Sequence, residues 1–120
     1  MNKTKSFKDL IVWQKAHKLV LEVYKTTKGF PKEEIYVLTS QFRRAAVSIA
    51  ANIAEGYKKK TVPAKLNYLN ISEGSLEEVK YYFILAKDLE YISDKVSDKL
   101  FNDAEEVGRL LTGYSNAINK

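Results

Sequence analysis

The sequence contains no cysteine, which excludes disulfide bonds and thiolate metal sites. His17 is its one histidine, so the di-iron site of some helical bundles, which needs two Glu-x-x-His motifs, is excluded too. No apolar run approaches the ~20 residues of a membrane span, and the N-terminus lacks the apolar core of a signal peptide. No glycine-rich phosphate loop is present. We therefore expect a cytoplasmic protein with no membrane role, no metal, no cofactor, no catalytic residues and no enzymatic activity.

Proline and glycine are also scarce, with two and five residues, and most of them lie where helical patterns end. Ser6 and Asp9 have the spacing of a capping box, and Pro31 and Pro63 suit the first turns of two further helices. Gly56 suits a left-handed position after a helix. No alternation typical of strands occurs. The expected helices span 7–28, 32–56, 63–91 and 94–118.

Four helices with short connections predict an all-α fold, an antiparallel up-down-up-down four-helix bundle in a single domain, residues 1–120. The segment 41–56, QFRRAAVSIAANIAEG, is poor in large side chains and should allow close helix packing. If the tight turn is centred near Lys59, Gly74 faces Ala45 and Ile71 faces Ser48. On this pairing Gly74 permits the close approach, and Gly74→Leu should be destabilising. The alternative is that Gly74 is a tolerated defect.

Two polar residues lie on otherwise apolar helical stripes. His17 is interpreted as a partly buried packing residue with one hydrogen bond. Asn52 needs a hydrogen-bond partner if it is buried, because an unpaired amide costs roughly 1–3 kcal/mol. Asn52 and Glu55 either bridge to a neighbouring helix or turn, or form a water-satisfied pair near a helix end. Both interpretations stay open.

The charge is divided unevenly along the chain. Residues 1–65 carry 14 Lys or Arg and 5 Asp or Glu, whereas residues 66–120 carry 6 and 10. This asymmetry suggests either a polyanionic partner or head-to-tail association between subunits, while the alternative is that these are ordinary solvated faces. The candidate phosphate-binding residues are Arg43, Arg44, Lys58, Lys59, Lys60 and Lys65.

Three segments carry a family resemblance: FKDLIVWQKAHKL at 7–19, VYKTTKGFPKEEIYVLTSQFRRAAVSIAANIAEG at 23–56 and GSLEEVKYY at 74–82. They resemble the four-helix bundle proteins encoded within intervening sequences of bacterial 23S ribosomal RNA genes. The resemblance implies an antiparallel bundle that assembles into a ring-shaped homopentamer. It also implies kinship with the accessory variability protein of diversity-generating retroelements, whose basic barrel binds nucleic acid and a reverse transcriptase.

The positions that match the family pattern mark structure more than chemistry, because none is an established catalytic residue of the family. They are Arg43, Arg44, Ser48, Asn52, Glu55, Gly56, Gly74, Ser75 and Glu78. The leading hypothesis is a non-enzymatic, oligomeric bundle that binds RNA or another nucleic acid through its basic half. The alternative is a protein-binding scaffold or assembly module with no nucleic-acid role.

Overall fold

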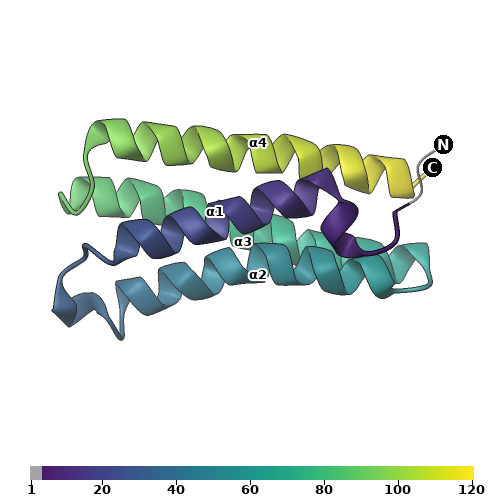
Figure 1. The fold of residues 1–120 in the computed structure, drawn as a ribbon, viewed down its shortest axis with the longest axis horizontal. Helices are drawn as coiled ribbons and strands as arrows, with labels where there is room; N and C mark the ends of the chain where they lie inside the picture. Colours follow the sequence, from purple (N-terminus) through teal and green to yellow (C-terminus); the bar gives the residue numbers. More distant parts are fainter. Residues whose placement is uncertain (1–3) are drawn as a thin grey trace.

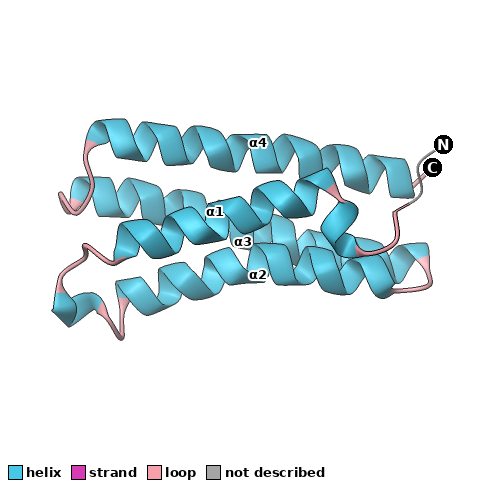
Figure 2. Cartoon of the chain, in the orientation of Figure 1, coloured by secondary structure: helices cyan, strands magenta, loops and turns pink. Residues whose placement is uncertain are grey.

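The computed structural model describes residues 4–120, which form a bundle of helices running side by side (Figure 1). This part of the chain contains helices and connecting loops and no strand (Figure 2). The predicted fold class, an all-α antiparallel four-helix bundle, is confirmed. The long helices are α1 (Ile11–Thr27), α2 (Leu38–Lys58), α3 (Val62–Asp88) and α4 (Asp94–Ile118), and short 3-10 helices are η1 (Phe7–Asp9) and η2 (Lys32–Glu34).

Consecutive helices are neighbours, and α4 closes the bundle by packing against α1. The α2–α3 turn, the start of α1 and the end of α4 lie at one end of the bundle, and the other two connections lie at the opposite end (Figure 1). The contact between α2 and α3 is the most extensive of the four.

The helices expected at 7–28 and 32–56 both begin later than predicted, because a short 3-10 helix stands at each expected start. The capping box of Ser6 and Asp9 is present, but it caps η1, and α1 begins later because Leu10 is extended. Pro31 likewise precedes η2, and Val37 has a non-helical backbone (φ −121°, ψ −100°), so α2 starts only at Leu38. Residues 35–37 are therefore an exposed turn between η2 and α2. Pro63 stands at the start of α3 as expected, and α4 begins at Asp94, the predicted first residue, with Ser93 as its N-cap.

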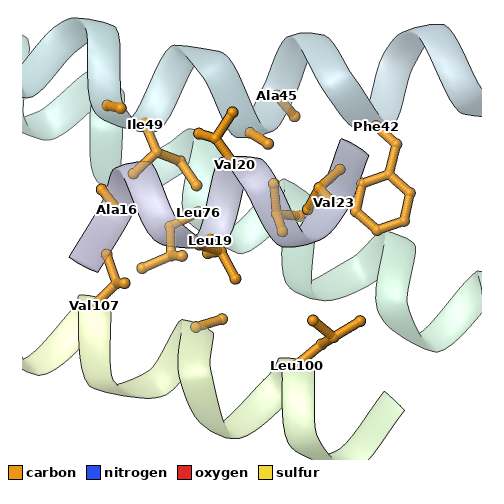
Figure 3. Close-up of a cluster of buried hydrophobic side chains, with 14 of the residues drawn as sticks. Ala16, Leu19, Val20, Val23, Phe42, Ala45, Ile49, Leu76, Leu100 and Val107 are labelled. Atoms are coloured by element: carbon orange, nitrogen blue, oxygen red, sulfur yellow. The ribbon is translucent and has the colours of Figure 1, made fainter. Parts of the chain in front are cut away.

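The core is a single cluster of aliphatic side chains closed at one end by aromatic rings. Figure 3 shows α1 between its neighbours, with Val20 on the side of α1 that faces α2, and with Val107 and Leu100 of α4 directed toward α1. Phe42 and Phe83 are fully buried and meet edge to face at 5.3 Å. Each large apolar side chain buried in this way contributes about 1.5–3 kcal/mol, so the bundle is held mainly by its core.

The connections at the far end are tied together by Glu34. Its carboxylate accepts a hydrogen bond from the Tyr91 hydroxyl (2.8 Å) and one from the Leu38 N–H (3.3 Å) at the start of α2. The hydrogen bond to Glu34 raises the pKa of Tyr91, since ionisation would place two negative charges together. Glu90 has a left-handed backbone (φ 65°) that lets α3 turn back toward this contact.

The structure gives two glycines roles that differ from those expected. Gly56 is not left-handed, because α2 continues to Lys58, and no glycine in the described part of the chain has a positive φ. Gly56 is instead a buried point of close approach: a Cβ there would lie 3.1 Å from the Tyr68 Cβ. Gly74 is exposed, and a Cβ there would meet nothing within 4 Å. The expected facing of Gly74 and Ala45 is therefore wrong.

The pairing of α2 and α3 differs from expectation by a few residues. The Ser72 hydroxyl donates to the Ile49 carbonyl (2.7 Å), and Ser75 rather than Ile71 meets Ser48 (2.8 Å). Ile71 itself is 45% exposed. The difference follows from the two further helical residues after Gly56, which move the centre of the α2–α3 turn toward the C-terminus.

Alanine substitutions at the two glycines should therefore change stability in opposite directions. Gly74→Ala should raise the free energy of unfolding by about 1 kcal/mol, because it removes an exposed mid-helix glycine. Gly56→Ala should lower it by about 1–3 kcal/mol, because the added methyl separates α2 from the backbone-proximal atoms of Tyr68. Urea denaturation of both variants beside the unmodified protein measures the two shifts. Two shifts of the same sign would contradict the assigned α2–α3 contact.

Candidate nucleic-acid interface

The two arginines of α2 lie in different environments. Arg43 is half-buried: its Nε donates to Thr27 Oγ1 (2.8 Å), and its guanidinium lies 4.7 Å from the centre of the Tyr24 ring. Arg43 thus ties α2 to the last turns of α1, and its position is fixed by the fold. Arg44 is exposed. Of the pair, Arg44 is the residue with the freer side chain.

A hollow of about 690 Å³ runs beside these arginines along the outer side of α2. Its lining combines Arg43 and Arg44 with small residues of α2 and with Tyr24 and Tyr36. Tyr36 is 92% exposed and belongs to the turn before α2. The hollow is therefore lined by cations and aromatic rings, and its small side chains leave the α2 backbone accessible to a ligand.

Three of the family-pattern residues form one hydrogen-bonded group between α2 and α3. Asn52 Nδ2 donates to the Ser48 carbonyl (2.8 Å) and to Ser48 Oγ (3.0 Å), and the Ser75 hydroxyl donates to Ser48 Oγ (2.8 Å). Asn52 therefore reaches α3 through Ser48, which favours the bridging interpretation for Asn52. Glu55 does not take part: it is exposed and lies beside a separate pocket.

The remaining family-pattern residues are apart from this group. Glu78 accepts a hydrogen bond from the Tyr82 hydroxyl (2.6 Å) one turn along α3. Burial, followed by this bond to Glu78, raises the pKa of Tyr82 to about 12. Gly56 lies in the contact with Tyr68, and Gly74 is on the exposed side of α3. The pattern thus marks several separate structural positions and not one site.

The basic segment from the end of α2 to the first turn of α3 contains both exposed and engaged lysines. Lys58, Lys59 and Lys60 are exposed, and Lys59 Nζ lies 5.0 Å from the centre of the Tyr68 ring. Lys65 is half-buried, and its Nζ donates to the Tyr57 carbonyl (2.7 Å) and to the Gly56 carbonyl (3.5 Å). Lys65 therefore caps the C-terminal end of α2, where its charge also complements the helix dipole.

The predicted phosphate contacts consequently fall into two groups on α2. From Arg43 to Lys58 the helix advances about 22 Å, at 1.5 Å for each residue. The structure brings Lys58, Lys59, Lys60 and Lys65 together at one end, but Arg43 and Arg44 lie well along the helix. A ligand that touches both groups has to extend along the outer side of α2.

The acidic half of the chain does not neutralise these cations. Among the described residues, ion pairs join α4 to its neighbours, as in Lys15–Glu106 (3.6 Å) and Lys80–Glu105 (2.9 Å), and none involves α2. Hydrogen bonds to Glu77 and Glu105 outweigh the effect of burial and raise the pKa of Lys80. Some acidic side chains are thus paired within the bundle, whereas Arg44 and Lys58 of α2 are exposed.

The aromatic contacts of α1 were not predicted from the sequence. His17 is exposed, not partly buried, and its ring stacks on Trp13 with centres 5.0 Å apart and planes 5° apart. Trp13 in turn meets Phe7 edge to face at 5.0 Å. The i, i+4 spacing of Trp13 and His17 is the signal that could have predicted the stack. The position of Lys5 beside α2 was not predicted either, because it depends on the path of the N-terminal segment.

Neither a metal-binding cluster nor a membrane-spanning helix is found among the described residues. Within residues 4–120, no group of three or more Asp, Glu or His side chains is placed to bind a metal ion. In the same part of the chain, every helix is too short or too polar to cross a bilayer.

The helices and their connections define the chain as a four-helix bundle protein. The family model of the 23S rRNA-intervening sequence protein matches residues 8–113, and the chain belongs to this family. It is also similar to a solved structure, a protein with unknown function from the S23 ribosomal protein family of Bacteroides thetaiotaomicron. The two are 25% identical, with a TM-score of 0.81, and the match covers 88% of this chain and 98% of the other. None of the curated proteins matches the chain.

Lys60, in the α2–α3 turn, and Lys65, in the first turn of α3, should respond differently to substitution. Lys65→Met keeps the apolar stem but removes the charged donor to the end of α2, so it should lower the free energy of unfolding by about 1 kcal/mol. Lys60→Met removes the same charge from an exposed position and should change stability by less than about 0.5 kcal/mol. Thermal denaturation of the matched pair measures the difference, and equal stabilities would show that Lys65 has no capping role.

Proposed function

We propose that this chain is a non-enzymatic, oligomeric bundle that binds RNA or another nucleic acid through the basic surface of α2 and the α2–α3 turn. The observation that carries the proposal is the division of charge in space. Arg44, Lys58, Lys59 and Lys60 are exposed, and no ion pair among the described residues involves them. Cations in this condition are available to neutralise phosphates and release counterions.

The shape of α2 supports the same proposal. Beside the two arginines its outer side carries short side chains, among them Ser48, Ala51 and Asn52, so a backbone of phosphates can come close to the helix there. Tyr24 and Tyr36 border the hollow beside Arg43, and aromatic rings next to cations are typical of surfaces that bind unpaired bases. Lys65 and Arg43 support this surface from within, because both are engaged in the fold.

Assembly is the second part of the proposal. The family resemblance implies a homopentamer, and a ring would repeat each lysine turn around its axis and strengthen a weak contact by multivalency. The exposed turn Ile35, Tyr36 and Val37 offers apolar surface for such a contact, with exposed fractions of 52%, 92% and 60%. A cytoplasmic location and the absence of catalysis stay predictions.

The same apolar turn favours one alternative, a protein-binding scaffold with no nucleic-acid role. Exposed apolar residues beside a hollow are common features of protein interfaces. On this alternative the partner is a second copy of the chain or another protein, such as a reverse transcriptase, and the lysines only keep the surface solvated.

Removal of the lysine turn should weaken binding to RNA strongly. We expect Lys58→Ser, Lys59→Ser and Lys60→Ser together to lower affinity for a ribosomal RNA fragment at least about tenfold. The slope of log K against log salt should fall by about 2, since each lost phosphate contact contributes ~0.7–0.9. Fluorescence anisotropy at several salt concentrations measures both. The matched control removes the same charge from the acidic half by Lys87→Ser, Lys95→Ser and Lys120→Ser.

The outcome separates the two functions. Equal losses in both triple variants, or no binding at low salt by the unmodified protein, would contradict nucleic-acid recognition by the turn. If binding is absent and light scattering shows that Tyr36→Ser dissociates an oligomer, the scaffold alternative is supported instead. Tyr36 suits this purpose because so exposed a side chain contributes little to the fold of one subunit.

A further inference from the structure

A second pocket lies where the N-terminal segment passes the last turns of α2. Its volume is about 530 Å³, within the range of small-ligand pockets, and carbon atoms dominate its lining. Phe7 and Tyr57 contribute rings, Ala54 contributes a small side chain, and Lys5, Lys58 and Lys59 contribute cations. The pocket therefore combines an apolar interior with positive charge at its margin.

The N-terminal wall of this pocket is held in place by hydrogen bonds. Asp9 Oδ2 accepts from the N–H groups of Lys5 (2.8 Å) and Ser6 (3.2 Å), and the hydroxyls of Thr4 and Tyr57 are hydrogen-bonded at 2.7 Å. The two backbone N–H groups lower the pKa of Asp9, so its carboxylate stays charged. The wall is thus formed before any ligand arrives, which reduces the entropy lost on binding.

A row of aromatic rings leads away from the pocket along α1. Phe7, at the pocket, meets Trp13 at 5.0 Å, and Trp13 stacks on His17 at 5.0 Å. Trp13 is half-buried and His17 is exposed, so His17 is the ring of this row that is most accessible to solvent. Rings in series next to lysines are the arrangement that single-stranded nucleic acids use for base stacking.

The charge around the pocket favours a polyanionic ligand over an uncharged apolar peptide. Lys5, Lys58 and Lys59 have no ion pair within the described part of the chain, and Glu55 is the one acidic residue in the lining. Glu55 is exposed and can turn toward solvent. The positive margin can therefore neutralise phosphates on either side of a base that occupies the apolar interior.

We propose that this end of the bundle binds unpaired nucleotides, with one base in the pocket beside Phe7 and Tyr57 and a neighbouring base against the Trp13–His17 rings. The inference rests on the nucleic-acid binding proposed above and adds the class of ligand, a single strand. A duplex keeps its bases paired and stacked inside, so it reaches the lysines but not the rings.

The test uses the full chain and Trp13, which is its one tryptophan and therefore reports on the ring directly. A short RNA strand and the same strand annealed to its complement are titrated at low salt, with affinity and tryptophan emission as readouts. We expect the single strand to bind at least about tenfold more tightly than the duplex and to quench the emission.

Two variants locate the stacking surface. His17→Ala and Phe7→Leu each remove a ring, and each should weaken single-strand binding about fivefold or more while duplex binding stays unchanged. His17 is exposed, so its substitution leaves the core intact. The matched control is Tyr81→Ala, which removes an exposed aromatic side chain of α3 near the opposite end of the bundle, outside both proposed binding surfaces, and should change neither affinity.

The results distinguish this inference from the function on which it rests. Equal affinity for single strand and duplex, with unchanged emission, would overturn the single-strand inference while the proposed nucleic-acid binding still holds. Single-strand binding that survives both ring substitutions would overturn it as well. No binding of either RNA at low salt would overturn both proposals.

Discussion

The close contact between α2 and α3 is the constraint on which the rest of the bundle depends. Gly56 lets α2 approach the Tyr68 Cβ, and the buried Ser72 hydroxyl reaches the Ile49 carbonyl across the same contact. A larger side chain at Gly56 would separate the helices and break this bond. Since the core side chains of all four helices meet in one cluster, the spacing of this pair also sets the room available to α1 and α4.

The same contact determines which surfaces stay free. One side of α2 packs against α3 and another against α1, so its outer side carries Arg44 and small residues. Most ion pairs involve residues of α4. Surface pairs of this kind contribute only about 0–1 kcal/mol each, so their main effect is to balance charge on that side of the bundle. The basic character of α2 is thus a consequence of helix placement and not only of composition.

Much of the architecture could be predicted from the sequence, because helical periodicity and proline positions are local signals. The position of the α2–α3 pairing could not, since it depended on whether α2 stopped at Gly56 or continued to Lys58. Gly74 was misinterpreted for the same reason. At the candidate site, the sequence indicated which cations cluster in the chain, but not that Lys65 caps α2 or that Arg43 binds Thr27. Those roles depend on contacts between distant residues.

Native-state hydrogen exchange tests the central claim most directly, because it measures the opening free energy of each backbone amide. If the α2–α3 contact holds the bundle together, amides at 46–53 of α2 and 69–79 of α3 should exchange only through global unfolding. Amides near the ends of α1 and α4 should exchange through smaller openings. Faster exchange in the central turns of α2 than in those of α4 would contradict the account.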